Sequence, residues 1–306
     1  MIQIREMETE HGRLKYEILE DHVVLREYRG KDILLTIPVN IEEKPVTVIG
    51  KKAFLGAKSL RELVLPECID TIQDWAFASC SNLEIITFPR KTLTIGQGIL
   101  RDCFRLEQVV AVDEDAGIEN GVSYLLAAAM NKLEAFYLFD LTAAGSPAWL
   151  EQWDARMLLL LEQADTEGFS KMLLCGEEDY GSKENHLDYY VEQRRRFKVR
   201  LAMLRLMHDI GLQPSVRETL TDYLQTHKKG ESSEETWKVV LEEHGDDKRY
   251  YQFLLDHGCI NEENFDAVLE DMGEFHTEMK AFLMNWRGKM TEREGKDAFG
   301  MLELEW

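Results

Sequence analysis

The sequence predicts an α+β protein of more than one domain, in which a short solenoid is followed by an all-α helical-repeat region. The chain has 306 residues, a length typical of about two domains. Three segments in its N-terminal part, which begin at positions 46, 69 and 92, align without gaps. After about residue 120, apolar residues follow the 3.6-residue period of helices instead of the alternation of strands. A repeat followed by helices therefore sets the fold class.

The three aligned repeats are residues 46–66, 69–89 and 92–112. A repeat this short cannot bury its apolar side chains alone, so equivalent positions of neighbouring repeats are expected to stack into ladders. Six apolar columns stay in register through the three repeats: Ile49, Ile72 and Ile95; Phe54, Phe77 and Leu100; Ala57, Cys80 and Cys103; Leu60, Leu83 and Leu106; Leu63, Ile86 and Val109; Leu65, Phe88 and Ala111.

Each repeat is expected to hold one short strand and one turn. The last residues of a repeat alternate between apolar and polar, and Pro66 and Pro89 close the first two repeats. Successive strands would form a parallel sheet on one face of the solenoid. The segments at 53–54 and 76–77, both Ala-Phe, predict a short helix or turn on the opposite face, and the glycines at 50 and 96 are expected to help a tight turn.

The repeats have the form IGxxAFxxxxxLxxLxLP and resemble the BspA-like class of bacterial leucine-rich repeats. The resemblance covers roughly residues 15–112, and residues 34–54 are similar to that family's usual first repeat. The third repeat departs from the pattern, since Ile99 and Leu100 replace Ala-Phe and Val112 replaces the proline. The solenoid is therefore expected to end there. The resemblance implies ligand or protein binding by a repeat surface, without catalysis, and it names no ligand.

The acidic segment at 112–121 contains two glycines and predicts a boundary. Residues 1–116 would form the leucine-rich-repeat domain, residues 117–290 a helical domain and residues 291–306 a C-terminal tail. Candidate helices in the helical part are 122–141, 147–164, 166–174, 185–210, 214–228, 234–244, 247–257, 262–272 and 275–287.

Two of the late stretches, 240–258 and 268–286, resemble each other. Both predict a helix, a glycine-containing turn and a second helix. They are similar to ankyrin repeats, although the TPLH signature of that family is missing and the spacing is irregular. A non-repetitive helical bundle is the alternative.

The charge of the chain argues against two classes of partner. The net charge is -21, and such a field repels both phosphate backbones and anionic lipid. We therefore expect neither a nucleic-acid nor a membrane partner. One basic cluster stands out in the acidic second half, at residues 194–196, 198 and 200, and it is expected to pair with acidic neighbours within its own domain.

Cysteine usage and hydropathy favour the cytoplasm. The five cysteines are an odd number at wide spacings, which favours reduced thiols over a disulfide framework. The N-terminal stretch has no apolar run of signal-peptide length, and no run approaches 18 apolar residues. We expect a cytoplasmic protein.

Sequence motifs of common enzymes are missing. The chain has no GxxxxGK[ST], no GxGxxG after a strand, no HExxH and no GxSxG. No catalytic, cofactor-binding or metal-binding residue is assigned, and the protein is expected to be non-enzymatic.

The first hypothesis is therefore a scaffold or adaptor that presents a repeat surface to a protein partner. The residues expected to bind are the outward positions of the strands: Glu62, Val64, Ile85, Thr87, Gln108 and Val110. Two alternatives stay open: an enzyme with an unrecognised site at the helical domain or the domain junction, and a self-assembling structural subunit. The oligomeric state also stays open.

Overall fold

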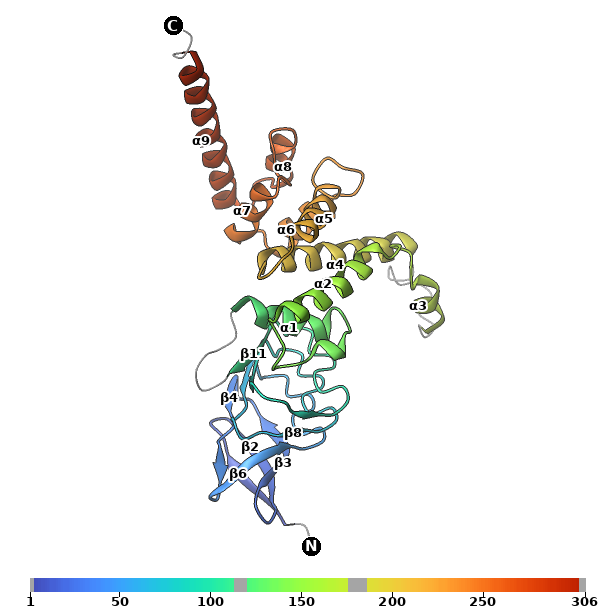
Figure 1. Cartoon of the computed structure of the whole chain (residues 1–306), viewed down its shortest axis with the longest axis vertical. Coiled ribbons are helices and arrows are strands. Elements are labelled where there is room, and N and C mark those ends of the chain that lie inside the picture. Colours follow the sequence, from blue (N-terminus) through green and yellow to red (C-terminus); the bar gives the residue numbers. More distant parts are fainter. Residues whose placement is uncertain (1–2, 113–119, 176–185, 303–306) are drawn as a thin grey trace. The chain divides into compact units, whose positions relative to one another are not determined.

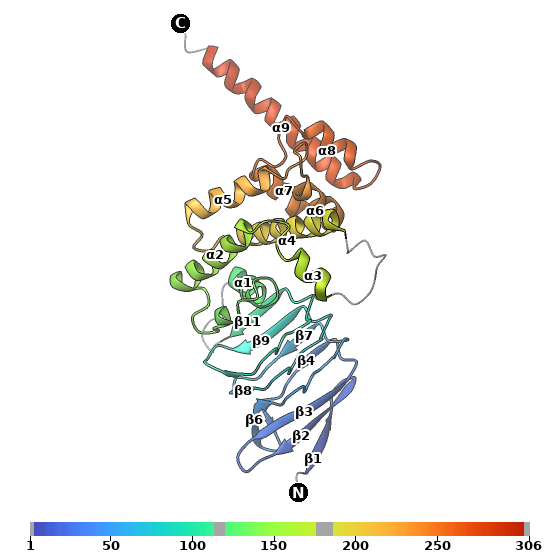
Figure 2. The same cartoon turned by 90° about the vertical axis from the view of Figure 1, so that its right-hand side faces the viewer.

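The structure is a computed structural model that describes residues 3–112, 120–175 and 186–302, with side chains described for 3–112, 121–173 and 186–290. The chain forms two compact units (Figures 1 and 2). The first consists of Met1–Glu162 and His208–Leu212, and the second of Gln163–Met207 and Gln213–Trp306.

The first unit contains the solenoid, which is built from two sheets. Its strands are β1 (Ile4–Glu8), β2 (Gly12–Ile18), β3 (Val23–Gly30), β4 (Leu34–Thr36), β5 (Asn40–Ile41), β6 (Lys44–Ile49), β7 (Glu62–Val64), β8 (Thr71–Ile72), β9 (Ile85–Pro89), β10 (Thr94–Ile95) and β11 (Gln108–Val112). One sheet has the order β1-β2-β3-β6-β8-β10, with β5 paired to β6. The other has four strands in the order β11-β9-β7-β4, and all of its neighbours run parallel.

The strand register confirms the repeat read from the sequence. In the four-stranded sheet Glu62 pairs with Ile85 and Ile85 with Gln108, while in the other sheet Thr71 pairs with Thr94. The six apolar columns form the core between the sheets, since every residue in them is buried except Ala57 and Ile95, which are half-buried. The solenoid makes about four turns.

The Ala-Phe segments form hydrogen-bonded turns that also stack. The Phe54 amide donates to the Ala76 carbonyl at 2.7 Å, and the Phe77 amide donates to the Ile99 carbonyl at 3.0 Å. Left-handed backbone conformations recur at equivalent positions of the repeats, in one column at Lys52, Trp75 and Gly98 and in another at Gly56, Ser79 and Asp102. The backbone conformation therefore repeats together with the sequence.

The two predicted turn glycines serve a different purpose from the one expected. Neither Gly50 nor Gly96 has a positive φ. A Cβ on Gly50 would lie 2.4 Å from the Leu25 carbonyl oxygen, and one on Gly96 would lie 2.4 Å from the Asp74 amide nitrogen. These glycines allow adjacent turns of the solenoid to approach closely.

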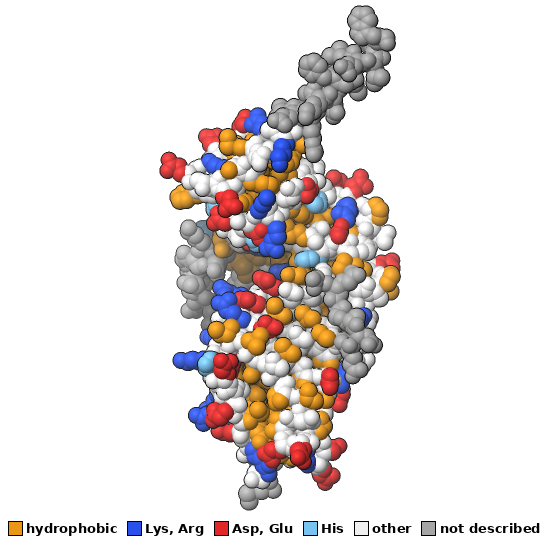
Figure 3. Space-filling view, turned by 90° about the vertical axis from the view of Figure 1, so that its left-hand side faces the viewer, with side chains coloured by type: hydrophobic (Ala, Val, Ile, Leu, Met, Phe, Trp, Pro, Cys, Tyr) orange, Lys and Arg blue, Asp and Glu red, His pale blue; other side chains and the backbone are white. Residues whose placement is uncertain are grey.

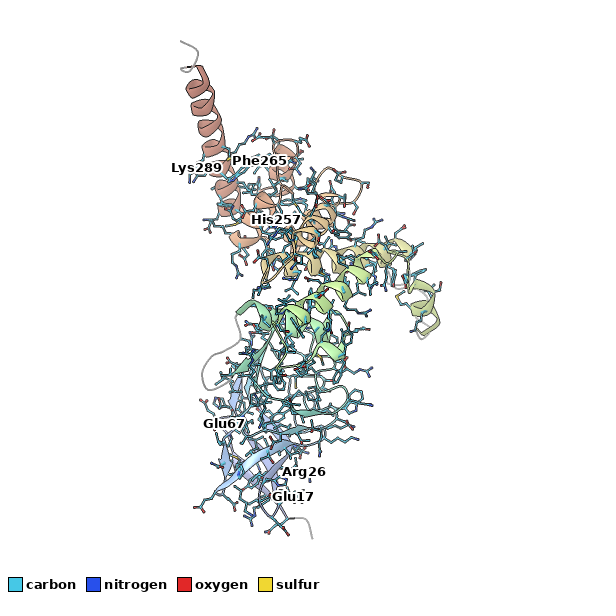
Figure 4. The ribbon with its side chains drawn as sticks, in the orientation of Figure 1. Glu17, Arg26, Glu67, His257, Phe265 and Lys289 are labelled. Carbon is cyan, nitrogen blue, oxygen red and sulfur yellow. The ribbon has the colours of Figure 1, made fainter. Side chains whose placement is uncertain are left out.

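The N-terminal strands cover one end of the solenoid core. Strands β1, β2 and β3 pair antiparallel, and the Arg26 Nε donates to a Glu17 carboxylate oxygen at 2.9 Å across β2 and β3 (Figure 4). Tyr28 on β3 stacks on Phe54, with ring centroids 5.5 Å apart, and Phe54 contacts Phe77 at 5.6 Å. A row of aromatic rings therefore continues from these strands into the repeats.

Helices cover the other end. They are α1 (Asn120–Asn131), a 3₁₀ helix η1 (Phe136–Leu138) and α2 (Pro147–Glu162). Helix α1 packs against β11 and buries Leu125 and Leu126, while the Trp153 indole donates to the Leu125 carbonyl at 2.9 Å. The boundary predicted near residue 116 falls on 113–119, outside the described residues, and the helices that follow it belong to the first compact unit.

The second unit is helical. Its helices are α3 (Phe169–Cys175), α4 (Leu187–Met207), α5 (Pro214–Gln225), α6 (Glu235–Glu243), α7 (Lys248–Asp256), α8 (Phe265–Asp271) and α9 (Thr277–Leu302). Helix α4 packs against α5 and α6, and α7 packs against α9. Residues 291–302, predicted as a tail, are the last part of α9.

The pairs α6–α7 and α8–α9 are related by a constant shift along the sequence. Under this shift, buried positions of the first pair correspond to buried positions of the second: Trp237 and Phe265, Val240 and Val268, Tyr251 and Met279, Leu255 and Leu283. Phe265 on α8 (Figure 4) also stacks on Trp286 of α9, with centroids 6.4 Å apart. The two pairs bury equivalent positions.

Candidate interaction surface

The six residues predicted to bind a partner lie on the outer face of the four-stranded sheet. They form two columns that cross the strands, one with Glu62, Ile85 and Gln108 and the other with Val64, Thr87 and Val110. All six are half-buried, and they alternate with the fully buried core column of Leu63, Ile86 and Val109. The parallel ladder therefore brings together residues from equivalent positions of successive repeats.

Strand β4 extends both columns by one position that the sequence did not reveal. Leu34 pairs with Glu62, and Thr36 pairs with Val64. The Leu34 side chain is 54% exposed, and Ile33 beside it is 62% exposed. The resemblance of residues 34–54 to a first repeat was the signal that could have located these positions.

The outer face of this sheet carries an apolar strip. It consists of Leu34, Val64, Ile85 and Val110, and Val112 at the end of β11 is 41% exposed. Figure 3 views the side on which Figure 1 labels β4 and β11, and apolar side chains gather there in a strip over the solenoid. In the strand register each of these four residues pairs with a polar residue of the neighbouring strand, so apolar and polar side chains alternate across the face. Apolar side chains gathered on a repeat surface are typical of a binding face.

Charged residues occupy two kinds of position at this face. Arg61 and Glu84 lie at equivalent positions just before β7 and β9, and they form an exposed ion pair at 3.0 Å. Glu62 lies within the face itself, with apolar Leu34 and Ile85 as its partners on the neighbouring strands. Within the described part of the chain, Glu62 forms no ion pair or side-chain hydrogen bond.

Helix α1 sets one limit of the face. The Gln108 Nε2 donates to the Tyr124 hydroxyl at 3.1 Å, and the Ser123 hydroxyl donates to the Gln108 Oε1 at 3.1 Å. Gln108 keeps its predicted place in the column, but its amide is already bonded to α1. In the described part of the chain, the residues from β4 to β9 and Val110 have no side-chain hydrogen bond to α1.

The cysteine column is packed as core. The Cys80 Sγ donates to the Phe54 carbonyl at 3.1 Å, and the Cys103 Sγ donates to the Phe77 carbonyl at 3.2 Å. The neighbouring Cys80 and burial both raise the pKa of the Cys103 thiol, which disfavours the reactive thiolate. Among the described residues, no three His, Cys, Asp or Glu side chains lie close enough to hold a metal ion.

The basic cluster of α4 is paired inside the second unit, as predicted. Arg195 and Lys198 both contact Asp165, each at 2.8 Å, and Arg196 contacts Glu242 at 2.7 Å. Arg200 forms a bidentate contact with Glu243. These four side chains are therefore paired with carboxylates of their own unit, whereas Arg194 donates to the Gln163 side-chain oxygen instead.

Comparison with known families identifies the repeats. Residues 35–123 match the family described as BspA type leucine rich repeat region, in six copies. The N-terminal repeats are of the BspA leucine-rich type. Leucine-rich repeats generally mediate protein–protein interaction, in line with the binding surface that the resemblance implied. The ankyrin-like interpretation of the helical unit has no counterpart in these matches.

Solved structures with similar regions include three leucine-rich-repeat proteins. A T. pallidum leucine-rich-repeat protein is 28% identical over 35% of this chain and 50% of its own, with a TM-score of 0.32. One from Bacteroides ovatus is 24% identical over 34% and 29%, with a TM-score of 0.30. A leucine-rich cell surface protein from Faecalibacterium prausnitzii is 21% identical over 35% and 30%, with a TM-score of 0.28.

The chain thus spans half the length of the first of these proteins and less than a third of the next two. No curated protein matches the chain. In the described residues, none of the helices has both the length and the apolar character needed to cross a bilayer.

Proposed function

We propose that this chain is a non-enzymatic interaction module that binds a protein partner through the outer face of its four-stranded sheet. The residues of this open sheet face are Leu34, Thr36, Glu62, Val64, Ile85, Thr87 and Val110, with Gln108 at its border. The observation that carries the proposal is the strip of apolar side chains at outward positions of the BspA-type repeats.

Two physical features favour binding at this face. Removing apolar surface from water contributes about 25 cal/mol per Å², so covering the exposed Leu34 and its apolar neighbours is favourable. The side chains also project from strands that are hydrogen-bonded on the sheet ladder, so little backbone order is lost when a partner docks.

The test is a pair of matched double substitutions. Val64→Lys with Thr87→Lys places two charges on adjacent strands of the open sheet face, where half-buried side chains can reach solvent. Thr71→Lys with Thr94→Lys places two charges on paired residues of the other sheet. Circular dichroism and thermal unfolding should show that both variants fold like the wild type.

Quantitative capture from cell extract, followed by measurement with the purified partner, should show binding to the wild type and the control but not to Val64→Lys/Thr87→Lys. Equal binding by both variants would place the interaction elsewhere. If thermal unfolding drops sharply only for the first variant, these positions belong to the core and the assignment is wrong. Light scattering on the same samples shows whether the bound partner is a second copy of the chain.

The helical unit is proposed to be an ankyrin-like stack. The equivalent burial of α6–α7 and α8–α9 under one constant sequence shift supports this proposal. A crystal structure should show the second helix pair related to the first by one translation and a small rotation. Pairs related by a large, unrepeated rotation would instead favour a helical bundle.

The proposed location is the cytoplasm. Cys68, Cys80, Cys103 and Cys259 are all free thiols in the described part of the chain, which suits a reducing compartment. Cell fractionation with a thiol-labelling reagent should recover the protein, fully reduced, in the cytoplasmic fraction. Recovery of an exported form would contradict this location.

A further inference from the structure

We propose that the open sheet face takes a short amphipathic helix of a partner protein, and that this helix places a lysine or arginine on Glu62. The inference rests on the proposed function and adds the chemistry and shape of the partner segment. Its basis is a single carboxylate in the middle of an apolar strip and the spacing of the strands that carry the strip.

Glu62 is the charged residue within the strip. Its neighbours on the adjacent strands are Leu34 and Ile85, and Val64 lies two residues along its own strand on the same face. The side chain is half-buried already, and within the described residues it forms no ion pair. The nearby Arg61 is paired with Glu84 at 3.0 Å. The carboxylate therefore depends on water for its solvation.

A partner that covers the apolar strip must also cover Glu62. Removing this water without a replacement leaves a buried, unpaired charge, which strongly opposes binding. A lysine or arginine of the partner would offset this cost, because its charge pairs with the Glu62 carboxylate in the dehydrated interface. The chain's net charge of -21 also favours the approach of a basic segment over an acidic one.

The spacing of the face fits a helix that crosses the strands. Neighbouring strands lie about 4.8 Å apart, so the four strands from β4 to β11 span about 14 Å. A helix advances about 5.4 Å per turn, so three turns, or about eleven residues, place one apolar side chain near each strand. An extended segment in this direction repeats its side chains only about every 6.6 Å and fits less well.

The experiment uses defined peptides with the full-length chain. The basic probe is a stapled twelve-residue helix with a leucine stripe and lysines beside it, and the acidic probe replaces each lysine with glutamate. A third probe carries the basic composition in scrambled order, without the apolar stripe. Fluorescence anisotropy measures the affinity of each probe for the wild type, Glu62→Gln, Glu62→Lys and the control Glu67→Gln, which lies beyond the strand (Figure 4).

We expect the basic helix to bind the wild type more tightly than either other probe. Glu62→Gln should weaken its binding about tenfold, in the range of a desolvated charge pair, and Glu62→Lys should reverse the preference between basic and acidic helices. Glu67→Gln should change the affinity of the basic helix less than twofold, as expected for an exposed charge outside the face.

Three results would overturn the inference: no binding of the basic helix to the wild type, equal binding of the basic and acidic helices, or a change of less than twofold in Glu62→Gln. If the natural partner still requires Val64 and Thr87 in any of these cases, the open sheet face binds a partner of other chemistry and the proposed function stands. If the natural partner binds the Val64→Lys/Thr87→Lys variant as tightly as it binds the wild type, the proposed function fails as well.

Discussion

Leu83 stands between Leu60 and Leu106 in a ladder of fully buried side chains. For single residues the sequence predicted burial well, because a residue that recurs at the same position of every short repeat is buried against its equivalents in the neighbouring repeats. The same reasoning located the outward positions of the strands. It could not find that Gln108 is bonded to Ser123 and Tyr124, since hydrogen bonding by α1 leaves no periodic signal.

Leu83→Ala should lower the free energy of unfolding by about 2–5 kcal/mol, through lost apolar burial and the cavity left between two neighbours. Leu55→Ala is the matched control, because Leu55 is 49% exposed on a turn of the solenoid. Urea denaturation of both variants measures the difference. Similar small effects at the two positions would show that the Leu60–Leu83–Leu106 column is not a packed ladder.

Asp32 makes the stability of the solenoid depend on pH. Burial alone would raise its pKa, but hydrogen bonds from the Thr9 hydroxyl, the Tyr28 hydroxyl and the His11 amide outweigh burial and lower the pKa below its ordinary value. A carboxyl whose pKa is lowered on folding stabilises the native state above its unfolded pKa, near about 3.9, and this contribution is lost as the pH falls through the folded value.

Asp32→Asn should therefore destabilise the protein at pH 7 by about 1–3 kcal/mol, because it weakens three hydrogen bonds to a charged acceptor. The difference from the wild type should shrink at pH 3, because this pH lies below the unfolded pKa of about 3.9 and the unfolded wild-type carboxyl is then mostly protonated. Thermal unfolding at both pH values provides the measurement. A difference of equal size at pH 7 and pH 3 would contradict the role of the ionised carboxylate.

Among the elements, strand β4 shows where sequence reasoning reached its limit. The sequence separation between the ladder neighbours Leu34 and Glu62 is larger than the separation between the other neighbours of this column. Those other pairs are Glu62 with Ile85 and Ile85 with Gln108. The additional length accommodates the β5–β6 hairpin, whose turn places Glu42 and Glu43 at φ values of 48° and 66°. An insertion of this kind breaks a gapless alignment without disturbing the ladder, so the first position of the open sheet face was missed.

For helix α4, by contrast, the composition of the sequence was sufficient to predict that its basic residues pair within their own domain. Its basic residues point to acidic neighbours on α6 and at Asp165, as expected for a cluster in an acidic domain. The ion pairs nevertheless differ in burial. The Lys198 side chain is 3% exposed, whereas the Arg200 side chain is 34% exposed.

Lys198→Ala should destabilise the second unit by about 1–3 kcal/mol, because it removes the buried ammonium group from Asp165 and leaves only the part-exposed Arg195 as its partner. Arg200→Ala should cost about 1 kcal/mol or less, and this cost should fall further in about 0.5 M salt, since exposed pairs are screened. Urea denaturation followed by circular dichroism compares the two. An equal loss of unfolding free energy in the two variants would mean that burial does not make the Lys198 pair more stabilising than the Arg200 pair.

For the whole molecule, the order of a solenoid followed by helices could be predicted, but the grouping of the helices could not. The apolar residues of α1 and α2 predict helices, but a helical pattern does not specify which surface the helix covers. In the structure they belong to the same compact unit as the solenoid, with α1 against β11. The third repeat, which departs from the consensus sequence, lies at the end of the solenoid that these helices cover.

We propose that the BspA-type repeats bind a protein through the open sheet face. A photo-activated cross-linking amino acid at position 64 tests this proposal, with position 71 on the other sheet as the control. In cells, position 64 should form a cross-linked product with a partner protein, and position 71 should form none. Cross-linking from position 71 alone, or equal cross-linking from both, would contradict the claim.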